Sequence, residues 1–165
     1  MRLVDSILAE MDQEAQTTRK VLDQVPEDKL SWKPHPKSYS LGQLALHIAS
    51  APAGIAAAAV PDTFERPYFT QAEAKSRKEV LDTFSQSLET AKAMLCQMDA
   101  TKLTSTWNLT KNGKVVMTIP RIGFLRAILM NHTYHHRGQL SVYLRLLNVT
   151  VPSIYGPSAD EDPFV

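Results

Sequence analysis

The chain has 165 residues, of which 44% are hydrophobic and 21% charged, and this composition is ordinary for a soluble globular protein. A chain of this length suits one domain with one core, so we expect residues 1–165 to form a single unit. The 18 basic and 17 acidic residues are mixed along the chain, which gives no reason to expect nucleic acid or a membrane surface as a partner.

The compartment is indicated by what the sequence lacks. Acidic residues at positions 5, 10 and 12 interrupt any signal-peptide core, and no uninterrupted apolar run is long enough to cross a bilayer. Cys96 is the single cysteine, which rules out an internal disulfide, and we expect it to be a partly buried structural thiol. The sequence therefore predicts a cytoplasmic protein.

The first predicted element is a helix over residues 2–24, with apolar side chains at helical spacing. Its inward stripe consists of Leu3, Ile7, Met11, Ala15, Thr18, Leu22 and Val25. The helix is expected to stop before Pro26. The passage W-K-P-H-P-K-S-Y that follows contains two prolines, which prevent regular helix, so we expect a loop held in place by Trp32.

A second helix is predicted to start near Ser40, because Gln43 three residues later gives the spacing of a capping box. The residues that then share one side are Leu41, Leu44, His47, Ile48 and Ala51. Pro52 lacks the backbone N–H and clashes with the preceding turn, so we expect a kink there. The alanine-rich continuation after Gly54 would allow another chain or helix to approach closely.

An irregular connection is predicted over residues 61–70, followed by a third helix over residues 71–98 with Thr70 as its N-cap. The core positions of this helix are Val80, Phe84, Leu88, Ala91 and Leu95. Between residues 104 and 118 the helical spacing of apolar residues ends, and Asn112-Gly113 is a strong hairpin-turn signal. We therefore predict a small β-hairpin there.

The fourth helix is predicted to run from Pro120, a favourable residue for a first helical turn, to about Leu147. Its stripe consists of Leu125, Leu129, His132, His136, Leu140, Tyr143 and Leu147. The residues from about 148 contain three prolines and an acidic patch and are expected to form an irregular tail. Four long helices, with a hairpin between the third and fourth, predict an all-α four-helix bundle.

Histidines occupy core positions on two of these helices. His132 and His136 are four residues apart, so their Cβ atoms lie about 5–6 Å apart on one helix face and both imidazoles can reach one metal ion. His135 is turned about 100° away from that stripe, so helix register selects His136. His47 lies on the core stripe of the second helix. Three inward histidines from two helices favour a metal site over the competing interpretation, hydrogen-bonded core histidines.

The donor set limits which metals suit this site. No Asp or Glu occurs between Pro120 and Ala159, so the fourth helix lacks the Glu-x-x-His pattern of di-iron bundles. An all-imidazole site with open positions suits Zn²⁺ or Ni²⁺, with Fe²⁺ or Mn²⁺ as further candidates.

Other polar residues near the histidines are candidates for supporting roles. Those that could orient an imidazole N–H group or a bound ligand are Gln43, Asn131 and Gln139, although ordinary helix-edge positions explain them equally well. Arg137 could hold an anionic substrate group, pair across an interface or lie in solvent. Tyr134 and Tyr143 are candidate proton donors, and core packing is the alternative role for Tyr143.

Two passages and the overall order of helices resemble the DinB superfamily of bacterial metalloproteins. The passage W-K-P-H-P-K-S-Y-S-L-G-Q-L-A-L-H-I-A is similar to the family's proline-rich loop, second helix and first ligand, which would be His47. The passage N-H-T-Y-H-H-R-G-Q-L resembles the family's H-x-x-x-H-R-G-Q element, which would make His132 and His136 the other ligands. The helix order fits over nearly the whole chain.

This resemblance implies an up-down-down-up bundle, usually a homodimer, with one divalent metal in a pocket between helices. Characterised relatives include thiol-dependent transferases and isomerases that use bacillithiol or mycothiol. The chain departs from the family pattern at Pro52 and the alanine-rich continuation, where bulky and charged residues are expected. This departure affects the wall of the pocket and therefore the substrate.

Three hypotheses of function follow. The first is a metal-dependent thiol S-transferase or hydrolase for small electrophilic molecules, a detoxification role in which the metal lowers the pKa of a low-molecular-weight thiol or water. The second is a non-enzymatic metal or small-molecule binding protein of a stress response. The third is a dimeric bundle with structural histidines. The sequence contains no convincing Ser-His-Asp set or glycine-rich phosphate loop that would supply other chemistry.

Overall fold

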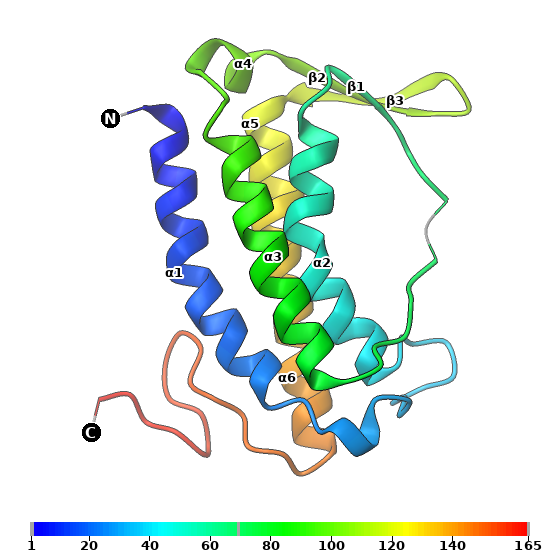
Figure 1. Cartoon of the computed structure of the whole chain (residues 1–165), viewed down its shortest axis with the longest axis vertical. Coiled ribbons are helices and arrows are strands. Elements are labelled where there is room, and N and C mark those ends of the chain that lie inside the picture. The colour runs from blue at the N-terminus through cyan, green and yellow to red at the C-terminus, as the bar shows by residue number, and fades with distance from the viewer. Residues whose placement is uncertain (1, 69, 165) are drawn as a thin grey trace.

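The computed structural model describes residues 2–68 and 70–164 and is mostly helical, with a small three-stranded mixed sheet at one end (Figure 1). The helical segments are α1 (Leu3–Asp23), the 3₁₀ turn η1 (Glu27–Lys29), α2 (Leu41–Ala59), α3 (Arg77–Leu95), α4 (Ala100–Thr104), α5 (Arg121–Phe124), the π-helical η2 (Leu125–Met130) and α6 (Asn131–Leu146). Segments α5, η2 and α6 follow one another without a break, where the sequence predicted one helix.

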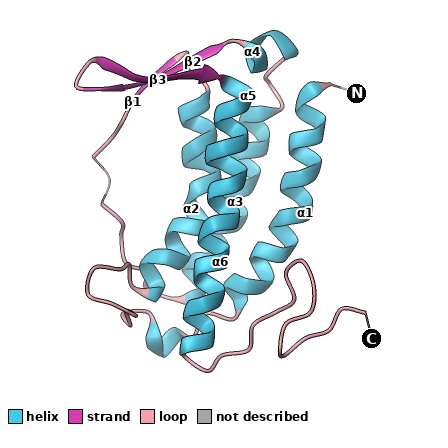
Figure 2. Ribbon diagram, turned by 180° about the vertical axis from the view of Figure 1, so that it is seen from behind, coloured by secondary structure: helices cyan, strands magenta, loops and turns pink. Residues whose placement is uncertain are grey.

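The long helices lie side by side along the long axis of the molecule. Helix α2 packs against α3 and α6, and α1 packs against the same two helices (Figure 1). Seen from behind, the sheet crosses one end of the helices and the C-terminal segment lies at the other end (Figure 2). From residue 149 onward the described residues form neither helix nor strand, so the irregular tail is confirmed.

The predicted start of the second helix is confirmed. The Ser40 hydroxyl accepts a hydrogen bond from the Gln43 backbone N–H, and the Gln43 side chain accepts one from the Ser40 N–H, both at 3.0 Å. Helix α2 then continues through Pro52. The Ser87 hydroxyl of α3 accepts a hydrogen bond from the Ala53 N–H at 2.8 Å and donates one to the Ser50 carbonyl at 3.2 Å. These two bonds join α3 to the backbone of α2 on both sides of Pro52.

The predicted start of the third helix is wrong by six residues. Helix α3 begins at Arg77, and its N-cap is Ser76, whose hydroxyl accepts a hydrogen bond from the Glu79 N–H at 3.0 Å. Thr70 is not its cap. The intervening residues form an extended connection that runs past α2 from the sheet to the start of α3 (Figure 1). This connection supplies a contact to the histidine site through Gln71.

The predicted hairpin is confirmed, and a third strand joins it. Strands β2 (Thr106–Lys111) and β3 (Lys114–Pro120) are antiparallel and joined at Asn112 (φ 53°) and Gly113 (φ 73°), the positive values that a two-residue hairpin turn favours. Strand β1 (Thr63–Glu65) pairs in parallel with β2 within the connection expected to be irregular. Strand β1 has only three residues, too few for the alternating pattern of a strand to show in the sequence. It could be recognised only from its pairing with β2 in the structure.

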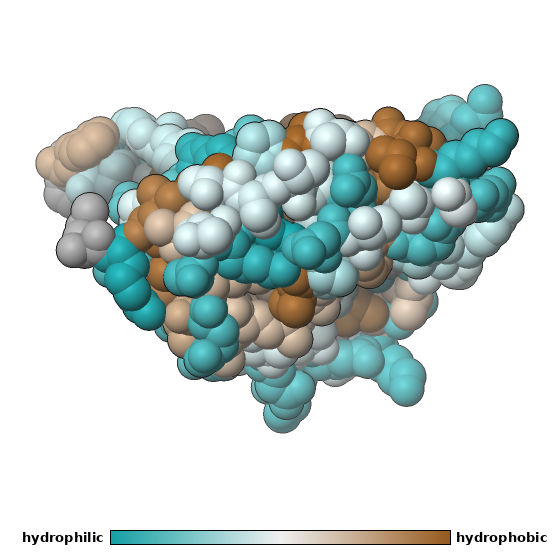
Figure 3. All heavy atoms as spheres, turned by 90° about the horizontal axis from the view of Figure 1, so that it is seen from above, coloured by the Kyte–Doolittle hydropathy of each residue, from teal (hydrophilic) through white to brown (hydrophobic). Residues whose placement is uncertain are grey.

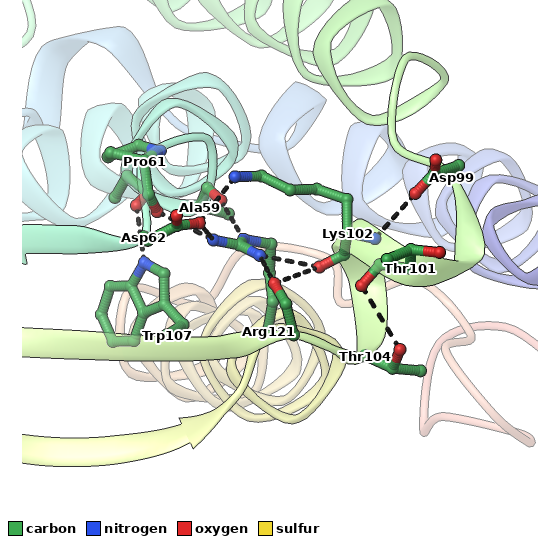
Figure 4. Close-up of polar contacts among 11 residues, drawn as sticks. Ala59, Pro61, Asp62, Asp99, Thr101, Lys102, Thr104, Trp107 and Arg121 are labelled. Carbon is green, nitrogen blue, oxygen red and sulfur yellow. Dashed lines mark hydrogen bonds and ion pairs between the residues drawn. The ribbon is translucent and has the colours of Figure 1, made fainter.

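Arg121 joins the sheet to the helices (Figure 4). Its fully buried guanidinium donates hydrogen bonds to the carbonyls of Ala59 and Lys102, both at 2.7 Å, and pairs with Asp62. The Trp107 indole N–H donates to the Ala58 carbonyl at 3.0 Å. These contacts satisfy carbonyls at the C-terminal ends of α2 and α4, which have no helical partner. They fix the sheet over the ends of α2 and α5.

The surface at the sheet end is mixed in character, with hydrophobic patches separated by hydrophilic residues (Figure 3). Helix α2 is long and apolar enough to cross a membrane by length and composition alone, although Gln43, His47 and Ser50 interrupt its apolar run. More than half of that window, 56%, is buried inside the protein, where α3 and α6 cover it. Such burial is typical of the core helix of a soluble protein.

Candidate metal centre

The three predicted histidines meet at one point between α2 and α6. His132 Nε2 lies 3.0 Å from His136 Nε2 and 3.4 Å from His47 Nε2. One nitrogen from each of the three rings lies within 4.8 Å of the others, and all three residues are partly buried. His135 is exposed and does not belong to this group, as helix register predicts.

Two glutamine side chains set the proton positions of two of these rings. His47 Nδ1 lies 3.1 Å from Gln71 Oε1, and His136 Nδ1 lies 2.7 Å from Gln139 Oε1. An amide oxygen only accepts hydrogen bonds, so Nδ1 of each ring carries the proton and donates it. Nε2 of each of these two rings is then unprotonated, and its lone pair faces His132 Nε2.

The three Nε2 atoms of the histidine cluster have the spacing of ligands to one metal ion. His132 Nδ1 is buried and has no hydrogen-bond partner among the described residues. Three nitrogens bound to one ion at roughly 2.0–2.1 Å lie about 2.8–3.4 Å apart, which matches the separations of 3.0 and 3.4 Å between the Nε2 atoms. The donor set therefore fits one divalent cation.

Burial keeps these imidazoles neutral. Loss of solvation, together with the smaller effect of the neighbouring His136 and His47 imidazoles, lowers the pKa of His132 to about 4. Burial likewise lowers the pKa values of His47 and His136, against a smaller opposing effect of their glutamine hydrogen bonds. Neutral imidazole is the form that binds metal, so the cluster is in its ligand form at neutral pH.

The π-helical segment η2 ends two residues before His132. Its i→i+5 hydrogen bonds place one extra residue in the turn, so the face of α6 is rotated relative to that of α5. Such segments are rare and are frequently found at functional sites. The apolar spacing of the sequence gives no signal for it, because Leu125 and Leu129 are buried as they would be in a regular helix.

The predicted supporting amides have different positions. Gln139 contacts His136 as expected. Gln43 does not touch a histidine, but its side-chain N–H donates to the Gln71 carbonyl at 3.2 Å and so holds the residue that contacts His47. Asn131 is exposed. Sequence reasoning missed Gln71, because it lies in a connection without periodicity.

Arg137, Tyr134 and Tyr143 contact other parts of the chain. Arg137 is buried and forms an ion pair with Glu14 of α1 at 2.7 Å, so the prediction of a solvated or substrate-holding arginine is wrong. The Tyr134 hydroxyl donates to Glu10 at 2.6 Å, and burial raises the pKa of Tyr134 above its usual value. The Tyr143 hydroxyl donates to the Tyr39 carbonyl at 3.3 Å, consistent with its alternative packing role.

A cavity of about 460 Å³ adjoins the histidine cluster. His47 and His132 form part of its wall. On α2 its wall is made of small residues, which include Ala51, Gly54 and Ala58. The small residues of α2 therefore leave room for this cavity beside the helix.

Comparison with known proteins relates this architecture to one family. The DinB family model matches residues 1–162. Uncharacterized protein YrdA of Bacillus subtilis (strain 168) is 28% identical over 158 residues, 96% of this chain and 91% of that protein. A DinB-like protein from Bacillus cereus ATCC 10987 has a similar structure, with a TM-score of 0.73, 27% identity and coverage of 92% of this chain and 97% of that one. The DinB-like protein YjoA from Bacillus subtilis gives a TM-score of 0.70 at 21% identity, over 90% and 97% of the two chains.

Proposed function

The chain belongs to the DinB family, and we propose that it binds one divalent metal ion and acts as a thiol S-transferase or hydrolase on small electrophilic molecules. The observation that carries this proposal is the convergence of three neutral Nε2 atoms, 3.0 and 3.4 Å apart, with a carboxylate from neither helix among them. An all-nitrogen set of three ligands is typical of catalytic rather than structural zinc, because it leaves a coordination position for a reactant.

The ligands of the ion would be His47, His132 and His136, with Zn²⁺ or Ni²⁺ as the leading candidates and Fe²⁺ or Mn²⁺ behind them. When bound, a divalent ion supplies Lewis acidity, which lowers the pKa of a thiol or water and yields a nucleophile at neutral pH.

The chain's own residues prepare the site for this chemistry. Gln71 and Gln139 hold the Nδ1 protons of His47 and His136, which fixes the orientation of both rings. The cavity beside His132 is mostly apolar, and such surroundings lower the local dielectric and strengthen electrostatic interactions at the reacting atoms. Tyr134 and Tyr143 are engaged elsewhere and have no part in the proposed reaction.

The proposal includes features of the whole molecule. We propose a single domain over residues 1–165, arranged as an up-down-down-up four-helix bundle and paired in a homodimer in the cytoplasm. The side-by-side arrangement of the long helices supports the bundle. The family resemblance supports the homodimer and a low-molecular-weight thiol as co-substrate. Burial of α2 in the core supports a location outside the membrane.

The test is turnover by zinc-loaded and nickel-loaded protein. Low-molecular-weight thiols are combined with epoxide and chlorinated aromatic acceptors, and hydrolysis of activated esters is followed in parallel. We expect turnover with wild type and with His135→Ala, the matched control on the exposed face of α6, and none with His132→Ala. Turnover that persists after the metal is removed would contradict the mechanism.

A non-enzymatic binding protein is the second candidate. It is favoured by the positions of Tyr134 and Tyr143, because their contacts leave the site without a candidate proton donor from the chain. Stoichiometric binding of metal and ligand without turnover in any of these assays would select this function.

A further inference from the structure

The cavity beside the histidines is elongated. Its wall includes His47 and also Ala58, eleven residues later on α2, and a helix rises 1.5 Å per residue, so the cavity extends for about 16 Å along α2. Trp107 and Leu109 of the sheet close the end away from the histidines. A volume of about 460 Å³ lies within the range of roughly 300–1,000 Å³ typical of small-molecule sites. The space suits a long, narrow molecule.

The walls between the two ends of the cavity are apolar. The Trp107 indole N–H is already bonded to the Ala58 carbonyl, and the Ser50 hydroxyl donates to the His47 carbonyl at 3.4 Å. Phe124 and Ile128 line the opposite side. The body of a bound molecule is therefore expected to be hydrocarbon or aromatic, because a polar group buried there would lose its hydrogen bonds to water.

Arg66 is the one charged side chain among the described residues that line the cavity, apart from the imidazoles. It directly follows β1, and its backbone N–H donates to the Thr110 carbonyl at 2.8 Å, which anchors it at the sheet. None of the described residues accepts a hydrogen bond from its guanidinium. Every other arginine of the chain donates from its side chain to an oxygen of the protein. Arg66 is thus available for a carboxylate or sulfonate, which a guanidinium binds with two parallel hydrogen bonds.

We propose that the cavity takes an elongated apolar acid, whose anionic group pairs with Arg66 while its other end lies at His47 and His132. That this acid is the substrate rests on the proposed function, and the inference then gives the substrate class. Binding itself needs only the cavity and Arg66, so it can be measured in metal-free protein.

Gly54 offers a direct way to close the cavity. A Cβ atom at this position meets nothing within 4 Å, so a larger side chain enters open space without a backbone clash. Glycine is also a poor residue for a helix interior, and its replacement by leucine favours the helix. Ala57 of the same helix is exposed and does not line the cavity, so Ala57→Leu is a matched control.

The experiment is calorimetric titration of metal-free protein with decanoate and with decanol. We expect decanoate to bind wild type and Ala57→Leu equally, and to bind Gly54→Leu at least tenfold more weakly. Arg66→Gln should weaken decanoate about fivefold or more and leave decanol unchanged, since only the acid pairs with the guanidinium. Circular dichroism verifies that each variant is folded, and Arg66→Gln changes an exposed loop residue, so the test does not depend on Gly54→Leu.

The inference is overturned if Arg66→Gln binds decanoate as tightly as wild type, or if Gly54→Leu folds and still binds it fully. Zinc binding by the same wild-type protein is measured after reconstitution with zinc. Absence of zinc binding with decanoate binding intact would contradict the proposed function and leave the acid site standing. Zinc-dependent turnover with no dependence on Arg66 would contradict the acid site alone.

Discussion

Two adjacent residues of α6, His136 and Arg137, belong to polar clusters of opposite kinds. Arg137 forms an ion pair with Glu14, donates to the Thr18 hydroxyl at 3.1 Å and also bonds to the Tyr155 hydroxyl. In this Arg137 cluster (Arg137, Glu14, Thr18 and Tyr155) charges and hydrogen bonds are matched within the chain. In the histidine cluster three ring nitrogens converge, and no acidic residue is among them.

The Arg137 cluster therefore has a structural role, whereas the histidine cluster is suited to binding a metal ion. A charge that is paired within the protein needs no ligand, whereas neutral ring nitrogens that converge on one point form a donor set for a metal ion. Helix α6 is held against α1 on one face, while its other face presents ligands to the cavity. The following changes test whether the two clusters are independent and whether only one of them needs a metal.

The largest expected effect is on the Arg137 cluster. Replacing Arg137 with Met leaves Glu14, of which 12% is exposed, as an uncompensated buried charge, so we expect a loss of about 3–5 kcal/mol in the free energy of unfolding. Arg145→Met is the matched control, because Arg145 pairs with Asp160 at the surface and such pairs contribute at most about 1 kcal/mol. Urea unfolding measures both. Equal losses would contradict the structural role of Arg137.

The glutamines around the histidine cluster should affect metal binding and leave the fold intact. Gln71→Leu and Gln139→Leu each remove the acceptor for an Nδ1 proton, so we expect zinc affinity to fall by about 10- to 100-fold. Competition with a chromogenic chelator measures this affinity. Gln86→Leu on the exposed face of α3 is the control and should bind zinc as wild type does. Unchanged affinity in both site variants would show that neither glutamine orients its ring.

The smallest effect is on the pH dependence of the metal-free protein. His132 has a pKa of about 4 in the folded state against a reference value of 6.5, so above pH 6.5 it is neutral in both states and does not affect stability. As the pH falls from 6.5 towards 4 the unfolded state binds a proton that the folded state does not, and stability decreases. The slope from one imidazole is at most about 1.4 kcal/mol per pH unit, and solvent around the half-buried ring reduces it.

Urea unfolding of metal-free wild type and His132→Leu at pH 7.5 and pH 5 measures this slope. The variant should lose less stability than wild type between the two pH values, because it lacks one of the depressed imidazoles. An equal loss in both proteins would mean that His132 titrates normally in the folded state.

The histidine cluster could be predicted because helix register is a local property. His132 and His136 share a face through their spacing alone, and the apolar neighbours of His47 place it inward on α2. The capping box at Ser40 and the turn at Asn112-Gly113 depend on residues a few positions apart, so these features were also predicted.

The features that could not be predicted depend on residues far apart in the sequence. Arg137 is buried because Glu14 and Tyr155, distant along the chain, both reach it. Gln71 contacts His47 only because the connection from β1 to α3 runs beside α2. Strand β1 exists only through its pairing with β2. The spacing of apolar residues along one helix or strand does not indicate such long-range contacts.

The most direct test of the account is the metal content of the purified protein. Wild type, His132→Ala and His135→Ala are reconstituted with zinc, desalted and analysed by inductively coupled plasma mass spectrometry. The account predicts one ion per chain in wild type and in His135→Ala, and none above background in His132→Ala. A full equivalent of zinc in folded His132→Ala would contradict the assignment of the histidine cluster as the metal centre.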